Sequence, residues 1–392
     1  MAKTVILGTA RTPIGKLSGA LSSLPATELG SIAIRGALER AGVEPTEVEH
    51  VVMGQVLQGG AGQIPSRQAQ IAAGIPIGVS SETVNKVCAS GLRAVAIADL
   101  HIRAGEVEVA IGGGMESMSQ APHALPGSRN GFRMGPATMI DLMQHDGLTN
   151  AFTGKQMYVE ATEVGDELSI TRESLDEFAA RSHDRALAAQ ANGNLPKEIV
   201  PVTVPGRKGD TIVDTDEGPR EGTTPETLSK LRGLVKDGTH TAGNSPSVND
   251  GAAALVLASE EWAQKNGKQI LGEIVGHAQV ADDFPYLAKT PAAAAKKALD
   301  RAGLTVDDID LWEFHEAFSS VGLNSMNVLG LTPENVNVNG GAVALGHPLG
   351  MSGARIIGSL VLELGRRGGG LGVAAICSGG GQGDAIIIRV NG

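Results

Sequence analysis

An internal repeat constrains the fold of this chain more than any other feature. Residues 37–54 read ALERAGVEPTEVEHVVMG, and residues 298–315 read ALDRAGLTVDDIDLWEFH. Aligned without gaps, the 18 positions contain five identities and five conservative replacements. Each copy is typical of a helix that ends at a glycine, Gly42 or Gly303, followed by an acidic turn and a buried strand. We therefore expect two similar halves with a site at their junction.

Two glycine-rich segments extend the repeat. Residues 107–114 and 372–381 each read as a strand that runs into glycines, and an apolar helix precedes each of them, at 92–102 and 354–364. Alternating strands and helices indicate α/β halves with largely parallel strands.

The segment between the two copies has a different character. Prolines and glycines interrupt it after residue 117, and a helical pattern covers Arg172–Ala191, with Ser169 or Thr171 as its cap. Six of the ten methionines lie between residues 115 and 157. Because methionine adapts to irregular apolar surfaces, this region either covers a ligand or a subunit contact, or simply fills the core.

These patterns predict three units. Residues 1–117 with 242–270 would form one half, residues 118–241 a loop domain, and residues 271–392 the second half. A length of 392 residues fits two or three domains. The net charge of −11 and the aromatic content of 3% argue against binding to nucleic acid or anionic membranes. No apolar stretch is long enough to span a bilayer, and residues 1–7 do not resemble a secretory leader, so we expect a cytoplasmic protein.

The two cysteines, Cys88 and Cys377, are the best candidates for chemistry. A disulfide is rare in a reducing cytosol, and the chain contains no closely spaced ligands of the zinc type, so no metal is expected. Inert buried thiols are the plain alternative. Cys88 however precedes a predicted helix, whose dipole would lower its pKa and whose backbone N–H groups could hold an oxyanion. These features favour a nucleophile.

The other two candidates lie in glycine-flanked turns. His347, between Gly346 and Gly350, could take a proton from a thiol. Cys377 follows a buried strand and precedes three glycines, which permit close approach of backbone N–H groups to a ligand oxygen. A second thiol with a tuned pKa could act as acid and base on a carbon acid.

Together these residues resemble the thiolase family over essentially the whole chain, and most closely its biosynthetic members, the acetyl-CoA acetyltransferases. The motifs that carry the resemblance are Arg11–Gly15, the Cys88 segment, Asn249–Ala253, His315–Phe318, Asn337–Ala342 with Gly346–Pro348, and Cys377–Gly381. The resemblance implies a five-layer α-β-α-β-α fold from two duplicated halves, a loop domain over coenzyme A, and a homotetramer assembled partly through the loop after Ser117.

The resemblance also implies a ping-pong mechanism without metal or redox cofactor. Cys88, with His347 as base, is acylated by one acyl-CoA, and Cys377 removes a C2 proton from a second acetyl-CoA. The carbanion then attacks the acyl group, giving a 3-ketoacyl-CoA. His347 and His315 would hold the enolate oxygen, and the N–H groups of Cys88 and Gly379 the tetrahedral intermediate. Further implied substrate contacts are Met157, Leu148, Arg220, Thr227, Ser247, Ala317 and Phe318.

Some positions depart from the family pattern. His315 stands where biosynthetic thiolases commonly have Asn, Gln156 where His is common, and Pro246 where Ser is common; the Met-Gly stretch expected near residues 285–290 is absent. A degradative 3-ketoacyl-CoA thiolase for longer chains therefore stays open, as does a non-catalytic acyl-CoA-binding scaffold, against which the two retained thiols argue. Decarboxylating and hydroxymethylglutaryl-type condensing enzymes usually have His at position 377 or lack the second thiol, so the chain speaks against them.

Overall fold

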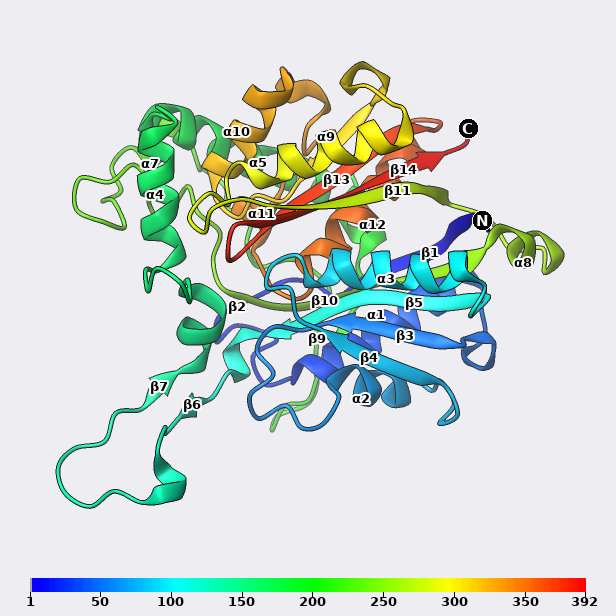
Figure 1. The fold of residues 1–392 in the computed structure, drawn as a ribbon, viewed down its shortest axis with the longest axis horizontal. Helices are drawn as coiled ribbons and strands as arrows, with labels where there is room; N and C mark the ends of the chain where they lie inside the picture. Colours follow the sequence, from blue (N-terminus) through cyan, green and yellow to red (C-terminus); the bar gives the residue numbers. More distant parts are fainter. Residues whose placement is uncertain (1) are drawn as a thin grey trace.

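The sequence repeat is a structural repeat in the computed structural model, which describes residues 2–392 (Figure 1). Helix α1 (Ala26–Ala41) ends at Gly42 and leads through a short 3₁₀ turn into strand β3 (His50–Gly54). Helix α9 (Thr290–Ala302) ends at Gly303 and leads in the same way into β12 (Leu311–Phe314). Both glycines are left-handed, with φ of 59° and 67°, which explains why each helix ends there.

The two halves also share the order of four equivalent strands. This order is β3-β5-β10-β1 in the first half, where β4 adds a fifth strand beside β3, and β12-β13-β14-β11 in the second. The bounds of the strands not yet given are β1 (Thr4–Arg11), β4 (Ser80–Val84), β5 (Val109–Ser117), β10 (Asn249–Ser259), β11 (Gly272–Ala281), β13 (Gly370–Ser378) and β14 (Gln382–Val390), with the short β2 (Gly15–Lys16) paired to β10.

The expectation of largely parallel strands is wrong. Only β3–β4, β3–β5 and β12–β13 are parallel, and the remaining pairings of both halves are antiparallel. The connections explain the difference. A tight glycine turn at residues 379–381 joins β13 to β14, and β10 follows the loop region, so neither strand is reached through the helical crossover that parallel pairing requires.

Helices and sheets alternate in five layers, which confirms the expected fold class (Figure 1). Helices α1 and α2 (Pro65–Ala72) cover the outer face of the first sheet, and α9 and α10 (Ser319–Leu329) that of the second. Helices α3 (Ser90–Ala104) and α12 (Ser352–Arg366) form the central layer. A short pairing of β1 with β11 joins the two sheets. Separate hydrophobic clusters fill the central layer and the two outer ones.

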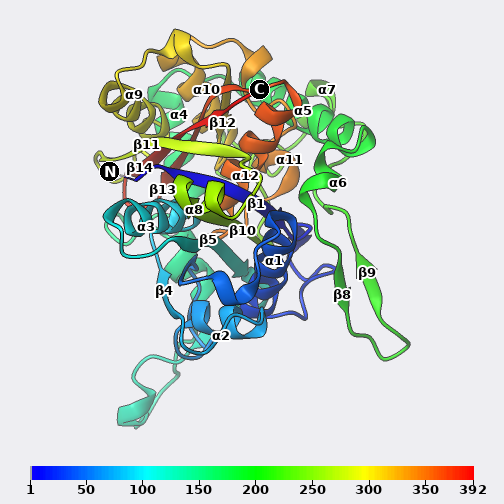
Figure 2. The same ribbon diagram turned by 90° about the vertical axis from the view of Figure 1, so that its right-hand side faces the viewer.

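Residues 118–241 form no further α/β layer. They contain α4 (Met157–Glu167), α5 (Arg172–Ala191), α6 (Asn194–Glu198) and α7 (Pro225–Leu228), and the hairpins β6–β7 (His123–Ala124, Ile140–Asp141) and β8–β9 (Val202–Val204, Thr211–Val213). Thr171 caps α5 by accepting a hydrogen bond from the Ser174 N–H, as one of the two predicted caps. Both hairpins project from the layers (Figures 1 and 2).

The remaining helices are short. They are α8 (Glu260–Lys265), α11 (Ala342–Leu345), the π-helical turn Met143–Leu148 and 3₁₀ turns at Met118–Gln120, Ser128–Asn130 and Pro333–Asn335. Within residues 2–392, no helix combines the length and apolar character that crossing a bilayer requires.

The central helices touch through their backbones. A Cβ atom added to Gly91, in the first turn of α3, would lie 2.7 Å from both the Gly350 oxygen and the Ala354 nitrogen. A Cβ on Gly353, in the first turn of α12, would collide with the backbone of Leu92. Only glycines allow this approach, which brings together the turns that precede the two helices, residues 85–89 and 346–351.

We predict that Gly91→Ala lowers the free energy of unfolding by about 1–3 kcal/mol, because the added methyl group meets backbone atoms that cannot move cheaply. Urea unfolding followed by circular dichroism measures the change. Gly365→Ala is the matched control, since that glycine lies in α12, is exposed, and has open space where its Cβ would be. It should change stability by no more than about 1 kcal/mol, in the favourable direction. Equal stabilities for the two variants would contradict the close-packing argument.

Candidate active site

One cavity gathers the predicted chemical groups from both halves. It encloses about 550 Å³, including its open mouth. Nine predicted residues line it: Cys88, Leu148, Met157, Ser247, Ala317, Phe318, His347, Cys377 and Gly379. The other lining residues are Met118, Gly147, Pro246, Val248, Leu287, Leu349 and Ser378. The resemblance implies a contact with coenzyme A at Pro246, whereas the sequence assigns no site role to the other six, although Met118 lies in the methionine-rich segment and Leu349 in the glycine-flanked turn of His347.

The turn that carries Cys88 is held in a strained conformation. Val87 has φ of 44°, in the left-handed region that a β-branched residue rarely adopts. The Ser90 hydroxyl donates to the Val87 oxygen at 2.6 Å and accepts from the Lys86 N–H at 2.8 Å. Ser378, next to Cys377, donates to the Lys86 oxygen at 2.5 Å. Contacts from both halves therefore fix the turn, as is common for strain at a functional site.

The electrostatic environment of Cys88 differs from the prediction. Its sulfur lies before the first turn of α3 and faces the N–H groups of Gly379 and of Cys88 itself, which favour the thiolate. Burial outweighs them and raises the pKa of the Cys88 thiol to about 12. The expected lowering of this pKa is therefore wrong for the free protein, because the two halves bury the sulfur. Cys88 is a neutral thiol at neutral pH.

His347 is held with one ring nitrogen free. The Ser352 hydroxyl donates to the Pro348 oxygen at 2.9 Å, so it can only accept from the His347 Nδ1–H, 2.7 Å away. This assigns the tautomer in which Nε2 carries no proton, and Nε2 is buried without a hydrogen-bond partner among the described residues. Burial, and then the charge of Arg355, lower the pKa of His347 to about 3. The ring is thus a neutral imidazole with an available base.

Asn249 fixes the backbone of His347. Its side-chain oxygen accepts from the His347 N–H at 2.9 Å and from the Ser247 hydroxyl at 2.9 Å, and its amide donates to the Gly15 oxygen at 2.8 Å. Gly346, with φ of 110°, lies against this amide, and a Cβ there would come within 2.5 Å of it. The motif that begins at Asn249 therefore positions the imidazole.

Cys377 shares the cavity with Cys88. It is the penultimate residue of β13 and is 2% exposed. Burial, and then the neighbouring Cys88, raise the pKa of the Cys377 thiol well above its ordinary value. Met157, Leu287, Ala317 and Phe318 supply the apolar surroundings. A thiol in such a place is neutral, and once it has lost its proton it is a strong base.

Three predicted residues do not line the cavity. His315 is fully buried, its ring centroid 4.1 Å from that of His347, and neither ring nitrogen has a partner among residues 2–392. Arg220 and Thr227 are exposed. The backbone N–H of Arg220 donates to His183, and Thr227 forms a capping box with Thr224 at the start of α7. The structure thus brings His315 beside His347, while the ligand contacts of Arg220 and Thr227 stay predictions.

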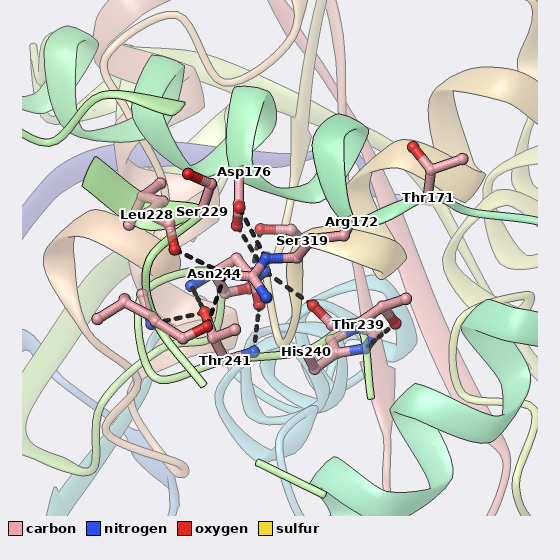
Figure 3. Close-up of polar contacts among 12 residues, drawn as sticks. Thr171, Arg172, Asp176, Leu228, Ser229, Thr239, His240, Thr241, Asn244 and Ser319 are labelled. Atoms are coloured by element: carbon pink, nitrogen blue, oxygen red, sulfur yellow. Dashed lines mark hydrogen bonds and ion pairs between the residues drawn. The ribbon is translucent and has the colours of Figure 1, made fainter. Parts of the chain in front are cut away.

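Figure 3 shows a polar network that includes Asn244, Asp176, Arg172 and Ser319. The Asn244 amide donates to Asp176 at 2.8 Å, Asp176 pairs with Arg172 at 2.7 Å, and both lie on α5. The Ser319 hydroxyl donates to the Asn244 oxygen at 2.9 Å. Since residues 246–248 and 317–318 line the cavity, the network holds both walls against one helix.

The comparisons with known proteins agree with this geometry. The family model described as "Thiolase, N-terminal domain" matches residues 4–261, and "Thiolase, C-terminal domain" matches residues 268–390. The chain belongs to the thiolase family. The boundaries drawn between the three units from the sequence stay a prediction.

Relatives match over their whole length. A "Probable acetyl-CoA acetyltransferase" of Mycolicibacterium smegmatis is 50% identical, over 98% of this chain and 100% of its own. An "Acetyl-CoA acetyltransferase" of Cupriavidus necator is 47% identical, over 99% of this chain and 100% of its own. Among solved structures, the acetyl-CoA acetyltransferase of Bacillus anthracis has a TM-score of 0.97 and 39% identity, covering 100% of this chain and 99% of that one.

The raised pKa of Cys88 gives a prediction for the free protein. Alkylation of Cys88 by iodoacetamide should quicken about tenfold per pH unit from pH 7 to pH 9, without a plateau, because the thiolate fraction grows in that proportion below a pKa of about 12. Mass spectrometry of the Cys88 peptide measures the rate, with a cysteine peptide of ordinary pKa as reference. A plateau below pH 8 would mean that the thiol is already ionised there.

Proposed function

We propose that this protein is an acetyl-CoA C-acetyltransferase, which condenses two molecules of acetyl-CoA to acetoacetyl-CoA and coenzyme A and also catalyses the reverse thiolysis. The observation that carries the proposal is that Cys88, His347 and Cys377 line one cavity, with two backbone N–H groups facing the Cys88 sulfur. The names of relatives that are 47–50% identical over their full length support acetyl as the transferred group.

In the first half-reaction, the free Nε2 of His347 takes the proton from Cys88. The thiolate attacks the carbonyl carbon of acetyl-CoA, and the N–H groups of Cys88 and Gly379 hold the resulting oxyanion. The carbon–sulfur bond to coenzyme A then breaks. The departing coenzyme A thiolate takes the proton of Cys377. Acetyl-Cys88, imidazolium His347 and a Cys377 thiolate remain.

In the second half-reaction, the Cys377 thiolate removes a C2 proton from a second acetyl-CoA. Its raised pKa makes it a strong base for this weak carbon acid. Imidazolium His347 holds the enolate oxygen. The His315 ring centroid lies 4.1 Å from that of His347, but His315 does not line the cavity, so its predicted contact with the enolate oxygen stays a prediction. The carbanion attacks acetyl-Cys88, and Cys88 leaves and recovers its proton from His347. The steps exchange thioester and carbon–carbon bonds and transfer protons without any net oxidation or reduction, so the proposed reaction requires no redox cofactor and uses no metal.

A degradative thiolase for longer acyl chains is the second candidate, favoured by His315 and by the sequence Asp283–Leu287, whose Leu287 lines the cavity. Thiolysis by coenzyme A of 3-ketoacyl-CoA substrates of four to sixteen carbons distinguishes the two. We expect kcat/KM to be highest for acetoacetyl-CoA and to fall at least about tenfold by six carbons, because the apolar walls limit the acyl group. A maximum at six carbons or more would assign the degradative role, and absence of turnover a binding scaffold.

The two thiols should fail in different ways. With acetyl-CoA, Cys88→Ala should give no acetyl adduct by intact-mass spectrometry, because the nucleophile is lost. Cys377→Ala should still gain one acetyl group, because the nucleophile and its base remain and the departing coenzyme A thiolate can take its proton from water. It should condense at least about 10³-fold more slowly, because the base for C2 is lost. Cys377→Ser, which keeps the size of the side chain, separates lost chemistry from lost packing. Absence of the adduct in both Cys377 variants would overturn this division of roles.

We further propose a cytoplasmic homotetramer. Two free cysteines suit a reducing compartment. The β6–β7 arm (residues 121–142) exposes Phe132 by 51%, Met134 by 98% and Met139 by 65%, as a contact surface between subunits does. Light scattering should give a mass close to four times that of one chain. Met134→Glu should lower this mass, while Ile77→Glu, at an exposed residue outside the arm, should leave it unchanged. A monomeric wild type would contradict the proposal.

A further inference from the structure

A cluster of two histidines and a carboxylate lies on the first half, remote from the cavity. His50 begins β3, Glu82 lies on β4 and His101 is in the last turn of α3. One ligand atom from each residue lies within 4.8 Å of the other two. The Nε2 atoms of His50 and His101 are 3.6 Å and 3.7 Å from the same oxygen of Glu82. These separations fit donors that share one ion, since ligands about 2.0–2.2 Å from a tetrahedral metal lie roughly 3.3–3.6 Å apart.

The other ring nitrogen of each histidine already has a partner. His50 Nδ1 lies 2.9 Å from the Ser80 hydroxyl, and His101 Nδ1 lies 2.5 Å from Glu106. Such contacts fix the tautomer and the ring orientation of metal-binding histidines, and a carboxylate partner raises ligand basicity. The Nε2 atoms of His50 and His101 therefore remain available, and both lie toward Glu82.

The unpaired nitrogen of His50 is an independent indication. Its Nε2 is buried and makes no hydrogen bond within residues 2–392, although the side chain is only 13% exposed. A buried polar atom without a partner carries a cost that a bound ion would remove. Ser80 pairs with His50 in the parallel ladder and Glu82 with Val52, so the strand register places Ser80 and Glu82 on one face, toward α3.

We propose that His50, Glu82 and His101 bind a divalent transition-metal ion, with zinc as the best fit. Two imidazoles and one carboxylate form a donor set typical of zinc, whereas calcium and magnesium prefer oxygen ligands. Glu82 is 47% exposed, so the ion can enter from solvent and complete its coordination with water.

The ion would have a structural role. It joins the end strand β4 to neighbouring β3 and to the far end of α3, three segments separated by at least 19 positions along the chain. Cys88 precedes the other end of α3, about 20 Å away at 1.5 Å per residue, so the ion takes no part in the reaction at the cavity. The proposal does not depend on the proposed function.

Zinc binding to the untagged full-length protein tests the proposal, with competition against a chromophoric chelator as the readout. The Cys88→Ala/Cys377→Ala variant serves as the background, because the cavity thiols and His347 could themselves bind zinc. We expect one ion per chain. Binding should weaken at least about tenfold in His101→Gln and Glu82→Gln, and about tenfold in Glu106→Gln, which loses the orienting carboxylate. His123→Gln, which removes another exposed histidine, should bind as the background does.

Cobalt(II) gives a second readout. Loaded into the wild-type protein at one equivalent, it should show visible d–d bands without a strong thiolate-to-cobalt band in the near ultraviolet, and the d–d bands should be lost in His101→Gln. A thiolate band at the first equivalent would place the ion at the cysteines and overturn the proposal. Unchanged zinc affinity in both His101→Gln and Glu82→Gln would overturn it as well.

Discussion

The arrangement of the site depends on a contact that contains no side chains. The first turns of α3 and α12 meet at Gly91 and Gly353, where any Cβ would strike backbone of the other helix. Cys88 lies just before one of these turns and His347 just before the other. The packing of the central layer therefore determines the spacing between Cys88 and His347, the proposed nucleophile and base, which are 259 positions apart.

The same packing sets the charge state of the site. Both thiols and the imidazole are buried between two sheets and are neutral. Burial raises the pKa of Cys88 and of Cys377 and lowers the pKa of His347. Backbone N–H groups at Cys88 and Gly379 supply fixed dipoles that cost no reorganisation when negative charge develops. In such a cavity Cys88 stays a neutral thiol until a base removes its proton, and it is not a permanently ionised nucleophile.

Much of the fold and of the site could be predicted from the sequence, because the repeat, the two glycine-capped helices and the ordered motifs around Cys88, His347 and Cys377 are local patterns. The direction of the strands could not be predicted, because the connections that precede β10 and β14 determine whether these strands run antiparallel to their neighbours. The pKa of Cys88 depends on how deeply the second half buries it, which no spacing in the sequence reveals. The cluster of His50, Glu82 and His101 comes from three segments that are far apart along the chain, so the spacing of these residues in the sequence does not reveal it.

The two copies of the repeat carry different residues at one equivalent position. Strand register pairs Met53 with Gly113 in the first half and Phe314 with Ala375 in the second, so Met115 is the counterpart of Cys377. Met115 is fully buried, and Gly30 leaves room for its sulfur in the outer core. In the first half the residue at this position therefore packs in the core, whereas in the second half it lines the cavity. The two halves therefore share a backbone arrangement, but they differ in the side chains at this equivalent position.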